Sequence, residues 1–192
     1  MKKTLLFLGQ TARRWRTMGA IAPSGGPLAR TMARQVGDLA DSQVIIELGP
    51  GTGVITRSLV ERFPRNPILA VEVNEPFIAP LRKEFPAAMV VRGCASQLEA
   101  YLAQIGRTAA DVGAVVSGVP LLSLPGDLPQ RILASVASVL RPGRPFIQLT
   151  YSERAWRRFH VGGFQRRPTK RVWLNVPPAF VLHFVRSEPS SS

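Results

Sequence analysis

A glycine-rich turn after an apolar run constrains the fold more than any other feature of the chain. The run Val44-Ile45-Ile46 reads as a buried strand, and the sequence ELGPGTG, residues 47–53, follows it directly. Glycine suits such a turn because the backbone bends sharply and approaches a ligand closely, where a Cβ would interfere. The GxGxG spacing differs from the GxGxxG of dinucleotide-binding turns, and Glu47 would repel a pyrophosphate but attract a cation. A glycine turn in a doubly wound fold without a ligand is the alternative.

The middle of the chain alternates strands and helices. Apolar runs predict strands at 43–48, 68–73, 88–92, 112–117 and 145–151, and helical patterns lie at about 53–63, 76–85, 95–105 and 127–140. This alternation indicates an α/β protein whose parallel sheet is covered by helices on both faces. A further helix is expected at PLARTMARQV, residues 27–36, after a Pro/Gly-rich break. Beyond Tyr151, the runs RVWLNV and AFVLHFV are expected to close the sheet as an antiparallel hairpin.

Positive charge is concentrated at the two ends of the chain. The net charge is +13, but residues 35–150 are neutral, whereas residues 1–34 and 151–192 carry the excess. Such a distribution indicates a polyanionic partner, either nucleic acid or an anionic membrane surface. One cysteine and two histidines exclude a disulfide framework and argue against a Cys/His zinc site, so no metal is expected.

Residues 1–18 are expected to form an amphipathic helix. Trp15 lies with the apolar side chains on one face, and Arg13, Arg14 and Arg16 lie opposite or at its margins. Such a helix suits the plane of a membrane interface, and packing on the core with a charged outer face is the alternative. The rest is expected to form one domain over 19–186, followed by a disordered tail over 187–192.

The pattern ExGxGxG, followed by an acid that ends the second strand, resembles the class I S-adenosylmethionine-dependent methyltransferases. The resemblance implies a Rossmann-like seven-stranded sheet whose last strand is antiparallel. It places the amino-acid part of the cofactor on the Gly49–Gly53 loop and the ribose hydroxyls on Glu72, at the end of ILAVEV. The cofactor-binding residues expected in this way are Glu47, Gly49, Gly51, Thr52, Gly53, Glu72, Val73, Gly93, Cys94, Ala95 and Ser117. Gly93, Cys94 and Ala95 are expected beside the adenine, although many members have Asp where this chain has Cys94.

The sequence VVSGVPLLSLP, residues 115–125, follows the fourth strand, where this family holds the atom to be methylated. Enzymes that methylate base amines carry Asn/Asp-Pro-Pro-Tyr or Asn-Leu-Pro-Tyr there, with the aromatic stacked on the flipped base. This chain retains Ser117 and loop carbonyls for an amine, but Leu121 replaces the aromatic. The loop is therefore expected to accept an amine attached to an apolar molecule.

Four segments together resemble the bacterial phospholipid N-methyltransferases over about 19–185: GAIAPSGGPLAR, VVSGVPLLSLP, RPFIQLTY and WLNVPPAFV. The resemblance implies methyl transfer from S-adenosylmethionine to phosphatidylethanolamine and its mono- and dimethyl derivatives, towards phosphatidylcholine, with S-adenosylhomocysteine as the other product. Ser117 and Tyr151 are the expected catalytic residues, with a core hydroxyl as the alternative for Tyr151. The residues expected to contact substrate or membrane are Arg13, Arg14, Trp15, Arg16, Ser24, Gly118, Leu121, Leu122, Arg157 and Arg158. For the leucines, which would border a lipid entrance, packing under a neighbouring helix is the alternative.

Two other functions remain open at this stage. An rRNA or DNA adenine methyltransferase shares the fold and would also explain the charge, but the missing aromatic at Leu121 argues against it. A catalytically inert membrane-binding protein is opposed by the intact Glu47, glycine loop and Glu72. The expected protein is a monomer that attaches peripherally to the cytoplasmic face of the membrane.

Overall fold

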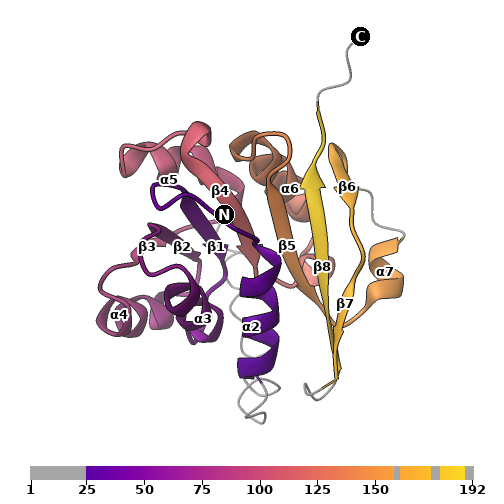
Figure 1. Ribbon diagram of the computed structural model, residues 1–192, viewed down its shortest axis with the longest axis horizontal. Coiled ribbons are helices and arrows are strands. Elements are labelled where there is room, and N and C mark those ends of the chain that lie inside the picture. Colours follow the sequence, from indigo (N-terminus) through magenta and orange to yellow (C-terminus); the bar gives the residue numbers. More distant parts are fainter. Residues whose placement is uncertain (1–24, 158–160, 174–177, 189–192) are drawn as a thin grey trace.

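The computed structural model describes residues 25–157, 161–173 and 178–188. The helix predicted over 1–18, with Arg13, Arg14, Trp15 and Arg16, lies outside these residues, as do Ser24, Arg158 and the end of the predicted tail. Within the described chain, helices cover both faces of a single twisted sheet (Figure 1). No helix of this part combines the length and apolar character that a membrane span requires.

The sheet has eight strands, in the order β3-β2-β1-β4-β5-β8-β6, with β7 also paired to β8. The strands are β1 (Val44–Leu48), β2 (Ile68–Glu72), β3 (Met89–Arg92), β4 (Val112–Ser117), β5 (Pro145–Thr150), β6 (Phe164–Arg166), β7 (Lys170–Val172) and β8 (Ala179–Arg186). The first five strands are parallel, and β8 runs antiparallel to β5. The α/β fold class and the antiparallel closing strand are confirmed.

The helices enclose two apolar layers, one on each face of the sheet. They are α2 (Gly25–Gln35), α3 (Val54–Arg62), α4 (Glu75–Glu84), α5 (Leu98–Gln104), α6 (Leu128–Val139) and α7 (Glu153–Arg157), with 3₁₀ turns η1 (Ala95–Gln97), η2 (Ala109–Asp111) and η3 (Leu121–Ser123). Along β1, Val44 and Ile46 pack in one layer with α5 and α6, whereas Ile45 packs in the other with α2 and α3. This alternation follows from the two-residue period of a strand and explains why β1 is apolar except at Glu47, near its carboxyl end.

Three details differ from the sequence-based prediction. The sheet has an eighth strand because β6, a three-residue segment with no apolar alternation, pairs with the second half of β8. The helix expected over 95–105 is divided into η1 and α5. Helix α2 already includes Gly25 and Gly26, which belong to the Pro/Gly-rich stretch that was expected to interrupt the chain, and its apolar face, including Met32, is buried in the core.

The carboxyl ends of the parallel strands meet at one edge of the sheet, the lower edge in Figure 1. Backbone hydrogen bonds join the first residue of each of three loops to the end of a neighbouring strand. Gly49 N donates to Val71 O, Gly93 N to Glu72 O, and Gly118 N to Leu48 O, each at 2.9 Å. In open α/β sheets ligands bind outside this edge, so the fold gathers the predicted site residues where a ligand site is expected.

Candidate active site

The loop between β1 and α3 is built from glycines in a conformation that other residues rarely adopt. Gly49, Gly51 and Gly53 have φ angles of 67°, 55° and 82°. All three lie in the left-handed region, where a Cβ causes strain. Gly53 also caps α3, and a Cβ there would lie 2.5 Å from Phe85 Cε2. The exposed Thr52 lies between the last two of these glycines. The loop therefore presents backbone rather than side chains to a ligand.

Glu72 connects this loop to the end of β2. Its Oε2 accepts a hydrogen bond from Gly51 N at 3.0 Å, and its Oε1 accepts from Asn74 N at 2.8 Å and from Asn74 Nδ2 at 3.0 Å. The side chain is 3% exposed. A carboxylate offers about four acceptor positions, and three are used here, so one position remains for a hydroxyl group of a diol at this edge. Val73, the next residue, is half-buried.

Glu47 is a fully buried carboxyl group beside the glycine loop. Neither of its oxygens has a hydrogen-bond partner among the described residues. Burial raises the pKa of Glu47 to about 8, the charge of Glu72 adds to this rise, and the nearby Thr56 opposes it. A buried acid without a partner is costly to the fold and is characteristic of binding sites. A cationic ligand group would favour the charged form of Glu47. The residues present thus fit a ligand that carries both a diol and positive charge.

We expect Glu47→Gln to stabilise the protein at alkaline pH. The usual pKa of 4.5 is raised to about 8 in the folded chain. Between these values the folded state binds a proton that the unfolded state has released, so stability falls as the pH rises through this window. The variant should match the wild type near pH 5 and exceed it by on the order of 4 kcal/mol at pH 9. Urea unfolding at both pH values, with the exposed Glu61→Gln as control, measures this; a constant difference would contradict it.

The segment after β3 forms the third part of the predicted cofactor site. Gly93 has no room for a side chain, because a Cβ there would collide with the Tyr101 hydroxyl. Cys94 is half-buried, and its Sγ lies 3.2 Å from Ser96 Oγ, which donates to it. Ala95 begins η1 and is 7% exposed. Gly93 is therefore required by the packing of Tyr101, and Cys94 and Ala95 follow it as small side chains at the carboxyl edge of the sheet.

The loop after β4 contacts the glycine loop directly. A Cβ on Gly118 would lie 3.0 Å from Gly49 O, and a Cβ on Gly49 would lie 2.9 Å from Val119 Cγ2. Together with the hydrogen bond from Gly118 N to Leu48 O, these contacts fix the two loops against each other. The two segments expected to hold the methyl donor and its acceptor therefore pack directly against each other.

Two residues that were expected to contact the substrate are buried in the structure. They are Ser117, at the end of β4, and Leu121, in the loop that follows. Ser117 is fully buried, and its Oγ accepts a hydrogen bond from Val119 N at 3.3 Å. Leu121 is 1% exposed and packs in the core layer that contains α6, as Leu124 does. For these two leucines the packing alternative holds, because η3 turns their side chains inward. Leu122 is half-buried and packs against the same layer.

Gln148 is a polar site residue that the sequence analysis did not consider. It lies on β5 beside Ser117, is fully buried, and donates from Nε2 to Val119 O at 2.9 Å and to Leu149 O at 2.6 Å. Its Oε1 has no partner among the described residues. A glutamine inside the apolar run PFIQLT is the signal that identifies it. Ser117 and Gln148 together hold both backbone polar groups of Val119.

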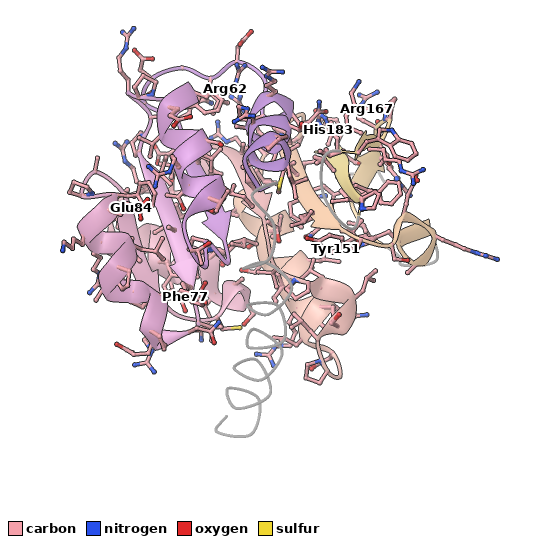
Figure 2. All side chains as sticks on the ribbon, turned by 90° about the horizontal axis from the view of Figure 1, so that it is seen from below. Arg62, Phe77, Glu84, Tyr151, Arg167 and His183 are labelled. Atoms are coloured by element: carbon pink, nitrogen blue, oxygen red, sulfur yellow. The ribbon has the colours of Figure 1, made fainter. Side chains whose placement is uncertain are left out.

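Tyr151 follows β5 at the same edge of the sheet. Its side chain is 38% exposed and borders a hollow lined also by Ser152, Glu153, Arg154 and Phe180. Figure 2 views the molecule from below, the side of the carboxyl edge, and labels Tyr151. Its exposure shows that it is not a core hydroxyl.

Arg157 is the last residue of α7. No group of three or more metal-ligating side chains occurs among the residues of known placement.

Two solved structures with a similar fold are named as methyltransferases. The 1,6-didemethyltoxoflavin-N1-methyltransferase of Burkholderia thailandensis, solved with S-adenosylhomocysteine, is 16% identical, with a TM-score of 0.73 over 97% of this chain and 89% of that one. A TehB-like S-adenosylmethionine-dependent methyltransferase from Corynebacterium glutamicum is 18% identical, with a TM-score of 0.62 over 93% of this chain and 97% of that one. At these identities the likeness establishes the Rossmann-like methyltransferase fold.

Sequence relatives define the family. No protein-family model matches the chain. The ribosomal RNA small subunit methyltransferase A of Bordetella pertussis is 31% identical over 86 residues, which is 45% of this chain and 31% of that protein. The ornithine lipid N-methyltransferase of Singulisphaera acidiphila is 33% identical over 183 residues, which is 93% of this chain and 94% of that protein. The chain therefore belongs to the family of S-adenosylmethionine-dependent methyltransferases that includes this ornithine lipid N-methyltransferase.

Proposed function

We propose that the protein transfers methyl groups from S-adenosylmethionine to the head-group amine of phosphatidylethanolamine and of its mono- and dimethyl derivatives, towards phosphatidylcholine. The observation that carries this proposal is the β4 loop, which contacts the glycine loop and has no aromatic side chain for a nucleic-acid base. Its Leu121 is buried in the core and presents nothing for a base to stack on. An amine on a flexible head group needs no such platform.

An ornithine lipid is the second candidate substrate. The relative from Singulisphaera acidiphila, which matches nearly the full length of this chain, carries that activity in its name. Both candidates present an amine on an acyl-chain-bearing molecule. The same loop and the same methyl donor therefore serve either substrate, and the contacts to the rest of the head group decide between them.

The proposed chemistry requires positioning and deprotonation of the amine. The cofactor supplies an electrophilic methyl group. The substrate ammonium, whose usual pKa is well above 7, must lose a proton before its lone pair can attack. The backbone carbonyls of the β4 loop accept hydrogen bonds from the amine, and the apolar surroundings favour its neutral form. Ser117 and Gln148 act by fixing Val119 in that loop, and Tyr151 orients the amine or the adjoining phosphate.

Membrane attachment is part of the same proposal. Residues 1–18 and the arginines at 157 and 158 would contact an anionic bilayer, where a lipid substrate resides. The protein would then act as a monomer on the cytoplasmic face of the membrane.

Labelled methyl transfer tests the function. Purified protein and labelled S-adenosylmethionine are incubated in three parallel reactions, which contain phosphatidylethanolamine vesicles, ornithine lipid vesicles or ribosomal RNA. The products of each reaction are separated by chromatography. Labelled mono-, di- or trimethylated phosphatidylethanolamine supports the primary proposal. Label in ornithine lipid alone would show that ornithine lipid, and not phosphatidylethanolamine, is the substrate. Label in RNA alone would overturn the assignment to a lipid.

We expect Gln148→Leu to lower kcat for lipid methylation by ten- to a hundredfold. The change removes the hydrogen bonds from Nε2 to Val119 O and Leu149 O, so the β4 loop loses its fixed position. Affinity for S-adenosylhomocysteine, measured by calorimetry, should change less than about threefold, since the hydrogen bonds of Gly51 and Glu72 remain. Gln165→Leu, on the exposed side of β6, is the matched control. Equal kcat in both variants would refute a positioning role.

A further inference from the structure

Exposed apolar side chains of the described residues gather at the carboxyl edge of the sheet. The large hydrophobic side chains exposed in this part of the chain are Val54, Tyr151 and Trp173, at 40%, 38% and 67%. Val54 follows the glycine loop, Tyr151 follows β5, and Trp173 follows β7, whose Val172 pairs with Ala179 at the start of β8. Because Phe180 pairs with Thr150, that end of β8 lies at the carboxyl end of β5. Three separate segments thus expose apolar groups on the same side as the active site.

The chain before Gly25 also joins the described fold at this edge. A Cβ on Gly25 would lie 3.2 Å from Val54 Cγ1, so the first residue of α2 adjoins the first residue of α3.

The exposed ring of Trp173 lies against the positively charged side chain of Arg171. The Arg171 guanidinium lies 3.6 Å from the centre of the Trp173 ring and 5.3 Å from that of Phe180. Stacking on aromatic faces holds a guanidinium in one place, and its weak hydration suits contact with phosphate. Tryptophan is enriched at membrane interfaces at the level of the head groups. The pair therefore presents an apolar ring and a phosphate-binding cation side by side.

A second exposed cation lies beside the hollow at Tyr151. Arg154 lines this hollow together with Tyr151 and Phe180, and Phe180 also contacts Arg171. The neighbouring acid, Glu153, is engaged by Arg166 at 2.9 Å, which offsets its charge. Arg154 thus lines the depression, and Arg171 lies over Phe180, which lines it too, so two positive groups adjoin the same aromatic side chain at the edge of the sheet.

We propose that this edge, which we name the docking edge (Val54, Tyr151, Arg154, Arg171 and Trp173), binds the surface of an anionic lipid bilayer. Trp173 enters the head-group layer, and Arg154 and Arg171 bind lipid phosphates. The inference rests on the proposed function, since docking in this orientation places the β4 loop against the layer that contains head-group amines. A bilayer fits better than single-stranded RNA, because Arg171 occupies one face of the Trp173 ring and the loop after β4 offers no aromatic side chain on which a base could stack.

Vesicle sedimentation tests the docking edge without depending on catalysis. Vesicles of phosphatidylcholine with phosphatidylglycerol carry anionic charge but no methylatable amine. The full chain, Trp173→Ala, Arg171→Glu and the control Arg141→Glu are compared. Arg141 is an exposed residue between α6 and β5, at the opposite edge of the sheet. We expect roughly tenfold weaker binding for Trp173→Ala and for Arg171→Glu, and a change below about twofold for Arg141→Glu. Thermal unfolding of each variant verifies that it is folded.

The outcomes separate the docking edge from the proposed function. Equal loss in Arg171→Glu and Arg141→Glu would show that net charge alone governs binding and would overturn the docking edge. If Trp173→Ala and Arg171→Glu bound vesicles like the wild type but bound a single-stranded oligoribonucleotide more weakly, the docking edge would be a binding surface for RNA and not for a bilayer. Selective loss of vesicle binding, in a protein that methylates no lipid, would retain the docking edge and refute the proposed function.

Discussion

Glu72→Ala is expected to weaken the binding of S-adenosylhomocysteine by about a hundredfold. The substitution removes the acceptor assigned to the ribose diol, and each hydrogen bond to a charged group contributes about 1.5–3 kcal/mol. It also removes the acceptor of Gly51 N and of both donors of Asn74, so the glycine loop loses its connection to β2. Isothermal titration calorimetry with purified protein measures the effect directly.

Glu75→Ala provides the matched control for this substitution. Glu75 lies three residues away at the start of α4 and forms an exposed ion pair with Arg92. Exposed ion pairs contribute about 0–1 kcal/mol, so affinity for the ligand should remain within about threefold of the wild type. Unchanged affinity in Glu72→Ala would refute the ribose assignment, whatever the control shows.

Gly118→Val is expected to lower the rate of methyl transfer by a hundredfold or more. A Cβ on Gly118 lies 3.0 Å from Gly49 O and 3.4 Å from Ile55 Cδ1, so a branched side chain must push the β4 loop away from the glycine loop. Displacement of reacting groups by about 1 Å costs on the order of a hundredfold in rate. The φ angle of Gly118 is not positive, so the effect comes from this contact and not from backbone strain.

Single-turnover methyl transfer and cofactor affinity are measured together for this variant. Gly118→Ala, which adds only the first carbon, should fall between the valine variant and the wild type. Overpacking of this kind costs about 1–3 kcal/mol of stability, so thermal unfolding is recorded in parallel. A valine variant that retains the full transfer rate would show that the two loops tolerate separation.

The strands at the centre of the sheet were predictable because their signal is local. Val44–Leu48 and Val112–Ser117 are buried on both faces, so each is mostly apolar in the sequence, with Glu47 and Ser117 as polar exceptions near the carboxyl ends. The glycine loop was predictable for a related reason, since its left-handed residues tolerate few other side chains. Glu47 and Glu72 then fall at the carboxyl ends of adjacent strands by topology alone.

The residues around the substrate were harder to predict because their orientation depends on packing. Leu121 reads as an exposed loop leucine, yet η3 turns it into the core. The segment 154–173 contains two tryptophans, and the structure buries Trp156 to 3% but leaves Trp173 67% exposed. Short segments without a regular period do not reveal which face of each residue is covered. Gln148 was missed because a single polar residue does not change an apolar strand pattern.

The arrangement of β6 and β7 along β8 bears on self-association. An open sheet edge is a template on which another copy can add a strand, and natural proteins prevent this with short, charged edge strands. Here the eight-residue β8 is covered by two three-residue strands, one of which carries Lys170 and Arg171. At the opposite edge, β3 has four residues and ends at Arg92. Neither edge offers a long apolar run, so crowding of many copies on one surface would not extend the sheet from one copy to the next.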